Sequence, residues 1–239
     1  PDLSSRSSDF FFLPCSEAES LSSLVVDLCS RRLPASYGYS PYTDIQVLSP
    51  GRKGELGTNE LNRKLQAVIN PPERGKKEAT LSGKLFREGD KVMQIRNDYD
   101  LPWVKADGET GEGVFNGDLG ILLEIDKRGS TITVQMDDRQ VVYEMETAGD
   151  ELELAYAMTV HKSQGSEFPA VILPLFPGPS QLYYRNLLYA AITRARSLLI
   201  LAGQPEIVRK MVENNRKTRR YSGLSVFLGK GETDETVSS

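Results

Sequence analysis

The sequence contains one histidine, His161, two cysteines, Cys15 and Cys29, and one tryptophan among 239 residues. One histidine and two distant cysteines are too few for a zinc site, and two cysteines are too few for a disulfide framework. Free thiols suit a reducing compartment, so we expect a cytoplasmic protein. No apolar run approaches the ~20 residues that a membrane-spanning helix requires. Because the chain starts at Pro1 without a methionine or a signal segment, we expect it to lie within a longer or processed chain.

A second absence concerns nucleotide chemistry. No stretch fits the phosphate-loop pattern G-x-x-x-x-G-K-[ST], and no apolar strand-like run ends in an acidic pair. An ATPase that uses this phosphate loop needs the loop lysine to contact the phosphates and the acidic pair to bind Mg²⁺. The sequence therefore predicts that this chain does not hydrolyse ATP alone. Since the net charge is −4, a nucleic-acid partner has to be argued from local sites.

Strand-like and helix-like segments alternate at both ends of the sequence, which is typical of a parallel sheet covered on both faces. In the first part, apolar runs at 9–15 and 44–50 predict strands, and amphipathic stretches at 16–33 and 58–70 predict helices, the second capped by Thr58. In the last part, the segments are strands at 152–157, 170–176 and 197–203, a short polar helix after 157, and helices at 180–195 and 204–215.

Between these parts, residues 80–152 form short alternating runs separated by Gly-Asp, Asn-Gly and Asp-Asp turns, a pattern typical of antiparallel strands. We therefore predict an α/β domain with a small antiparallel β barrel inserted into it. The expected boundaries are 1–79 and 153–228 for the α/β domain, 80–152 for the barrel, and 229–239 for a flexible tail.

The stretch "MTVHKSQGSEF", residues 158–168, combines small polar side chains with the single histidine. If a strand ends just before it, Thr159 caps the next helix, and backbone N–H groups, the threonine hydroxyl and the His161 ring face outward to hold a phosphate. Gly165 permits close backbone approach, and the Glu167 carboxylate suits sugar hydroxyls. A polar surface loop without a ligand is the alternative for this stretch taken alone.

The stretch "LLYAAITRARSLLIL", residues 187–201, places Arg194 and Arg196 where an apolar helix meets a buried strand. Arginines at the C-terminal end of a helix commonly complement its dipole. A guanidinium at such a corner can also reach a phosphoryl group of a bound nucleotide. The residues alone leave both interpretations open.

Five ordered blocks carry a family resemblance: "IQVLSPGRKGELGTNELNRKLQ", "GDKVMQIRNDYD", "GVFNGDLGIL", "LAYAMTVHKSQGSEF" and "RNLLYAAITRA". Together they resemble the C-terminal half of RecD-type DNA helicases, the exodeoxyribonuclease V alpha-subunit branch of superfamily 1, from about Asp9 to about Leu228. In that family "SPGRKG" resembles motif IV, "TVHKSQGSEF" motif V and "YAAITRAR" motif VI. The resemblance implies a second RecA-like motor domain with an inserted barrel of the Src-homology-3 type.

The resemblance also implies a nucleotide site. Arg194 would be the arginine finger on the γ-phosphate of ATP, and Arg52 a second γ-phosphate contact. Glu167 would accept a hydrogen bond from the ribose, and Gly165 would let the backbone come near. The cofactor would be ATP with Mg²⁺, whose ligands would lie in an N-terminal RecA-like domain that is absent from this sequence.

Single-stranded DNA is the partner that the resemblance implies. Thr159, His161, Ser163 and Gln164 would contact the sugar-phosphate backbone of the tracked strand. Other exonuclease-complex subunits are further possible partners, and the family moves 5′ to 3′. In the barrel, we expect "RNDYDLPW" to be an exposed loop in which three side chains hold or stack on nucleic acid, although the tryptophan could instead cover the barrel core: Arg96, Tyr99 and Trp103.

Two other functions remain open from the sequence. The barrel could bind a protein partner while the α/β part serves as a scaffold, which would make the chain a non-catalytic interaction module. The chain could also be the helicase-like segment of a conjugative relaxase. A phosphate-loop lysine upstream of this sequence would favour the helicase, and a relaxase tyrosine domain would favour the relaxase.

The missing phosphate loop gives the first testable prediction. The purified chain should show no DNA-stimulated ATP hydrolysis, because the loop lysine and the acidic metal ligands are absent. Phosphate release in the presence of single-stranded oligothymidylate measures this directly. Catalytic turnover by the pure chain would contradict the assignment of the missing groups to another domain.

Overall fold

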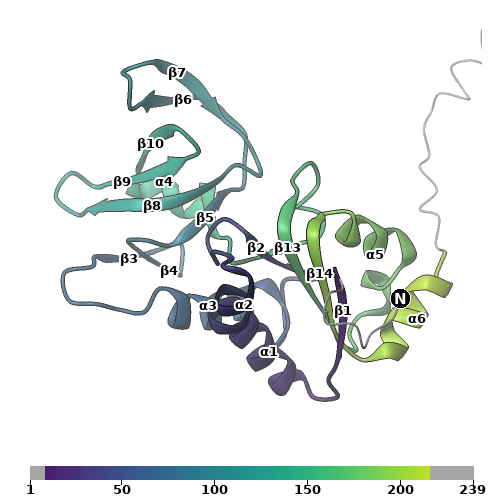
Figure 1. Ribbon diagram of the computed structural model, residues 1–239. Helices are drawn as coiled ribbons and strands as arrows, with labels where there is room; N and C mark the ends of the chain where they lie inside the picture. The colour runs from purple at the N-terminus through teal and green to yellow at the C-terminus, as the bar shows by residue number, and fades with distance from the viewer. Residues whose placement is uncertain (1–8, 216–239) are drawn as a thin grey trace, which may run out of the picture.

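The computed structural model describes residues 9–215 of the chain. These residues form a parallel five-stranded sheet with helices and an antiparallel seven-stranded sheet inserted into it (Figure 1). The fold class predicted from the sequence, an α/β domain with an inserted antiparallel β unit, is confirmed. The tail expected at 229–239 lies outside the described residues.

The parallel sheet has its longest apolar strands at the centre. Its order is β1 (Phe10–Pro14), β14 (Ala195–Gly203), β13 (Phe168–Leu175), β2 (Ile45–Ser49) and β12 (Ala157–Thr159), and neighbouring strands run parallel. Every residue of β2 is buried. Strands covered on both faces read as continuous apolar runs, which is why this part of the fold was predictable from sequence.

Helices cover both faces of this sheet (Figure 1). One face packs against α1 (Ala18–Asp27), the π-helical turn Leu28–Arg32, α2 (Leu33–Tyr37) and α3 (Thr58–Ile69). The other face packs against α5 (Arg185–Ile192) and α6 (Pro205–Glu213). Alternate residues of β13 supply the two cores: Ile172 faces α3, whereas Val171 and Leu173 face α5 and α6.

The inserted β unit comprises the elements from β3 to β11. A two-stranded hairpin, β3 (Glu78–Leu81) and β4 (Lys84–Arg87), precedes the seven-stranded sheet. That sheet has the order β11 (Leu152–Leu154), β5 (Lys91–Gln94), β8 (Leu119–Asp126), β9 (Thr131–Met136), β10 (Arg139–Glu144), β6 (Asp98–Lys105) and β7 (Thr110–Val114), and α4 (Met145–Glu151) leads into β11. Its core is separate from those of the parallel sheet and includes Phe86, Leu122 and Val134.

A buried polar network joins the inserted β unit to α3. The Asp90 carboxylate, fully buried, accepts hydrogen bonds from Gln66 Nε2 (2.6 Å), Asn70 Nδ2 (2.7 Å) and the Tyr156 hydroxyl (3.0 Å). It also accepts from the Arg87 backbone N–H at 2.7 Å. Burial nevertheless raises the pKa of Asp90 above its ordinary value. Because removing one partner of such a network leaves buried groups unsatisfied, the network holds the two units in one arrangement.

Three predictions about helices were wrong. Residues after β12 form turns instead of a helix, because Thr159 continues the ladder with Ser49 of β2, and Gly165 has φ +91°. Thr58 is not the helix cap, since α3 starts at Thr58 and Gly57 is the capping residue. The helix expected at 180–195 is limited to Arg185–Ile192, preceded by a 3₁₀ turn at Ser180–Leu182.

The expected loop "RNDYDLPW" is also corrected, since β6 occupies residues 98–105. Trp103 of this strand pairs with Val141 of β10 on one side and with Gly111 of β7 on the other. Asp, Pro and Asn obscured this strand in the sequence because they are typical of turns, whereas the ladder forms through partners distant in sequence.

The buried lysine next to Asp90 gives a pH prediction. Lys91 Nζ donates to the Ile45 carbonyl (3.2 Å) and to Gln46 Oε1 (3.0 Å), and burial lowers the pKa of Lys91 from 10.5 to about 8. Between these values the unfolded chain holds a proton that the folded chain has lost. The unfolding free energy should therefore rise with pH, by at most about 1.4 kcal/mol per pH unit.

Urea unfolding of the wild type and Lys91→Met at pH 7.5, 8.5 and 9.5 measures this contribution. The wild type should gain stability relative to Lys91→Met as the pH rises, because methionine is unbranched like lysine, one atom shorter, and has no titrating group. Parallel pH profiles for the two proteins would show that Lys91 is not desolvated in the folded state.

Candidate functional site

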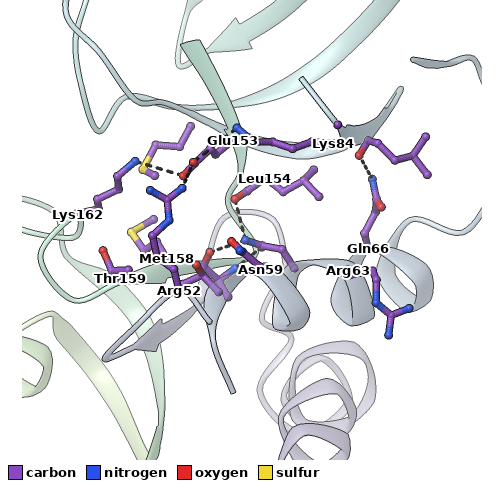
Figure 2. A pocket seen from close by; sticks show the side chains of 16 residues that line it. Arg52, Asn59, Arg63, Gln66, Lys84, Glu153, Leu154, Met158, Thr159 and Lys162 are labelled. Carbon is purple, nitrogen blue, oxygen red and sulfur yellow. Dashed lines mark hydrogen bonds and ion pairs between the residues drawn. The ribbon is translucent and has the colours of Figure 1, made fainter. Parts of the chain in front are cut away.

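A cavity of about 560 Å³ lies between α3 and the inserted β unit (Figure 2). The β2–α3 loop contributes Arg52, the turn after β12 contributes Lys162, and β4 contributes Lys84. Further lining comes from five apolar residues, Leu85, Met93, Leu154, Ala157 and Met158. Polar groups of α3 and β12 also contribute, among them Asn59, Arg63 and Thr159. Both units of the fold are therefore needed to form it.

Within the cavity lining, Glu153 of β11 is the carboxylate that the cations share. Arg52 Nη2 pairs with Glu153 Oε1, Lys162 Nζ lies 3.3 Å from Oε2, and Lys84 Nζ lies 3.6 Å from Oε1. Figure 2 shows these side chains converging on the carboxylate from different elements. We call these four residues the Glu153 cluster. Burial opposes ionisation of Glu153, but the three cations outweigh it and lower its pKa below the ordinary value.

The segment after β12 follows the edge of this cavity. Thr159 lines the cavity and pairs with Ser49 across the ladder. The exposed His161 ring lies with Nε2 3.0 Å from the Tyr184 hydroxyl oxygen. Ser163 is fully buried and donates its hydroxyl to the Val160 carbonyl at 2.8 Å, which fixes the turn.

The next residues leave this edge and approach the start of β14. Gln164, Gly165 and Glu167 are exposed. Glu167 Oε2 lies 3.1 Å from Arg196 Nε, in an ion pair whose side chains are both more than half exposed. Because solvent screens such a pair, its contribution to stability is small and both groups remain available to a ligand.

Arg194 links the segment 158–168 to the end of α5. Its Nη1 donates to the Ser166 carbonyl at 3.0 Å, and its Nε donates to the Ala190 carbonyl at 3.2 Å. Arg194 and Glu167 are thus brought to one corner of the parallel sheet. Arg52 lies instead in the Glu153 cluster, and within residues 9–215 it shares no hydrogen bond or ion pair with Arg194.

The three barrel residues singled out from the sequence occupy different environments. Arg96 and Tyr99 are exposed, and the Tyr99 ring, 66% exposed, meets Phe115 edge to face with centroids 5.8 Å apart. Trp103 is half-buried, with Lys105 Nζ 5.6 Å and Arg139 Cζ 5.8 Å from the ring centroid. In the described part of the chain its indole Nε1 is buried without a hydrogen-bond partner.

Sequence reasoning missed Glu153, Lys84 and Lys162. Lys162 could have been identified from the sequence, because it belongs to the stretch "TVHKSQGSEF". Glu153 and Lys84 gave no signal, since an isolated Glu or Lys in a polar sequence is ordinarily a solvated surface residue. Their role depends on the folding of β4 and β11 against the β2–α3 loop.

Two family models match separate parts of the chain. Residues 61–136 match the family model of the SH3 domain of ATP-dependent RecD-like DNA helicases, and residues 154–202 match the UvrD-like helicase C-terminal domain. The inserted β unit is therefore a domain of the SH3 type, and the parallel sheet carries the C-terminal domain of a helicase.

Two similar proteins are RecD-type helicases. The ATP-dependent RecD2 DNA helicase of Deinococcus radiodurans is 38% identical over 183 residues, which cover 75% of this chain and 23% of the relative. The RecBCD enzyme subunit RecD of Mycolicibacterium smegmatis is 31% identical over 179 residues, which cover 75% of this chain and 28% of the relative. The chain belongs to the RecD-type helicases and spans about a quarter of the length of these relatives.

Solved structures are less similar. The Pif1 helicase of Bacteroides, in complex with ADP-AlF3 and single-stranded DNA, aligns with 90% of this chain and 50% of its own length at 19% identity and a TM-score of 0.46.

Among residues 9–215, every helix is too short or too polar to span a membrane. Over the same residues, no three His, Cys, Asp or Glu side chains are grouped to hold a metal ion.

Proposed function

We propose that this chain is the C-terminal motor segment of an ATP-dependent DNA helicase that moves 5′ to 3′ on single-stranded DNA. The observation that carries the proposal is the bond from Arg194 to the Ser166 carbonyl, which joins the motif VI arginine to the motif V segment at one corner of the sheet. A phosphate-loop domain on the same polypeptide would face this corner. Closure of the two domains on ATP and reopening after hydrolysis would then alternate the grip on DNA.

The nucleotide side of the proposal uses the half-buried Arg194 and the exposed Gly165 and Glu167. Arg194 would contact the γ-phosphate, Glu167 would accept from the ribose, and the exposed Gly165 would allow close backbone approach. ATP supplies the phosphoryl group, and Mg²⁺ would be held by acidic ligands of the phosphate-loop domain. Arg52 would be a second γ-phosphate contact, for which it has to leave Glu153.

The DNA side of the proposal uses the cavity edge. Thr159, His161 and Gln164 would contact the sugar-phosphate backbone, while the buried Ser163 would hold the turn that presents them. Backbone contacts position a strand without reading its sequence. On the SH3-type unit, Arg96 and Tyr99 would hold or stack on the strand, with Trp103 beneath Lys105 and Arg139 in support.

The relatives also favour a biological setting. One relative is named as a subunit of the RecBCD enzyme, so we include association with other exonuclease subunits and a role in DNA repair or recombination in the proposal. The relative from Deinococcus radiodurans is named as an ATP-dependent helicase without reference to such a complex. Either arrangement uses the same motor segment.

The experiment on this function replaces Arg194 in the longer protein that carries this chain and a phosphate-loop domain. Arg194→Ala should lower DNA-stimulated ATP hydrolysis by about 10³-fold, the effect of losing an arginine finger. Oligothymidylate binding without nucleotide should stay within about threefold of the wild type. Arg209→Ala is the control, because Arg209 is an exposed arginine on α6 outside the proposed nucleotide and DNA contacts, and it should retain most of the hydrolysis.

Near-normal hydrolysis by Arg194→Ala would mean that Arg194 is not an arginine finger and only binds the Ser166 carbonyl. Arg194→Lys separates the two roles further, since lysine keeps the charge but cannot form the forked contact with a phosphate. Equal losses of hydrolysis and of nucleotide-free DNA binding would indicate a collapsed corner instead of a missing arginine finger.

A further inference from the structure

The Glu153 cluster contains more positive charge than its carboxylate balances. Three cations share Glu153, and Glu153 is the only carboxylate among the described residues that line the cavity. Arg63 also lines the cavity, but its guanidinium pairs with Glu60 of the same helix at 2.5 Å. The cavity wall is therefore cationic although the whole chain has a net charge of −4.

We propose that this cavity is a binding site for a phosphate oxyanion, and that Glu153 is the internal anion which an entering phosphate displaces from Arg52, Lys84 and Lys162. The carboxylate is held by charge-assisted contacts of the kind that a phosphate makes with Arg and Lys. Its side chain is only 17% exposed and lies among the three cations that would bind a phosphate. Displacement exchanges one anion for another and leaves no cation unpaired.

The origin of the three cations gives the displacement a structural consequence. Arg52 follows β2 and Lys162 follows β12 at the same edge of the parallel sheet, whereas Lys84 belongs to the β3–β4 hairpin. In the present structure Glu153 of β11 ties the hairpin to both loops. A phosphate that takes all three cations would replace Glu153 as this link and free β11 from it.

Glu153 competes with a phosphate for the three cations near neutral pH because its carboxylate is ionised there. Burial disfavours its charged form, but Lys162, Arg52 and Lys84 outweigh the burial, so its pKa lies below the ordinary value. Glu153 consequently remains ionised at the pH at which a phosphodiester is ionised. A neutral group of the same shape at this position would leave the cations free for the ligand.

The proposal rests on the proposed function only for the source of the phosphate. A backbone phosphate of single-stranded DNA and the triphosphate of a nucleotide present the same oxyanion chemistry. Thr159 on the cavity edge favours DNA, whereas Arg52 has a proposed nucleotide role. Two probes separate these sources: an oligothymidylate of twelve nucleotides and inorganic tripolyphosphate.

The test compares the whole chain with Glu153→Gln, which keeps the size of the side chain and removes its charge. Binding of both probes is measured from low to physiological salt. Glu153→Gln should bind at least one probe about three- to tenfold more tightly at low salt. If that probe is oligothymidylate, its salt dependence should steepen by about 0.7 in log–log slope for each additional phosphate contact. Glu151→Gln removes the same charge two residues away, outside the cavity lining, and should bind within about twofold of the wild type.

The outcomes distinguish this proposal from the proposed function. Tighter tripolyphosphate binding with no oligothymidylate binding by any variant would support the phosphate site and contradict the DNA path. Unchanged or weaker binding of both probes by a folded Glu153→Gln would overturn the proposal, because Glu153 would then only position the cations.

A measurement on the wild type avoids reliance on a variant that fails to fold. The side-chain carboxyl carbon-13 resonance of Glu153 should shift when whichever probe binds is added, because its cations leave it, while that of Glu151 stays in place. Binding of a probe without this shift, or no binding of either probe, would also overturn the proposal.

Discussion

The buried carboxylate of Asp90 is the interaction on which the arrangement of this molecule depends. It accepts hydrogen bonds from Gln66 of α3, from Asn70 at the C-terminal cap of α3, and from Tyr156, which follows β11. A buried carboxylate is stable only when its oxygens are satisfied, so neither unit can move away without exposing or orphaning these groups. The cavity between the two units is therefore a fixed feature of the fold rather than a gap between loosely tethered parts.

Helix α3 transmits this constraint to the site. Asn62 donates from Nδ2 to the carbonyls of Leu154 (2.9 Å) and Ala157 (2.8 Å), and its Oδ1 accepts from the Ala157 N–H at 2.7 Å. These bonds hold the chain between β11 and β12, and so set Glu153 on one side and the motif V turn on the other. Opposing charges thereby meet across the cavity, although the residues that carry them are far apart in sequence.

The parts of the fold that local sequence determines were predictable, and the parts that long-range pairing determines were not. The apolar runs of β2, β13 and β14 predict buried parallel strands because both of their faces are covered. The strand at 98–105 was missed since its turn-like residues are held by ladder partners. The family motifs singled out Arg52 and Thr159, whereas Glu153 has meaning only once β11 brings it to Arg52.

In the proposed function, one nucleic-acid strand would lie across both units at this cavity. Hydrogen–deuterium exchange of the chain, with and without oligothymidylate, tests it most directly, because bound DNA slows exchange where it covers or orders the backbone. We expect slower exchange both in the turn at 160–165 and in the inserted β unit around residues 96–103. Protection confined to one of the two units, or absent from both, would contradict it.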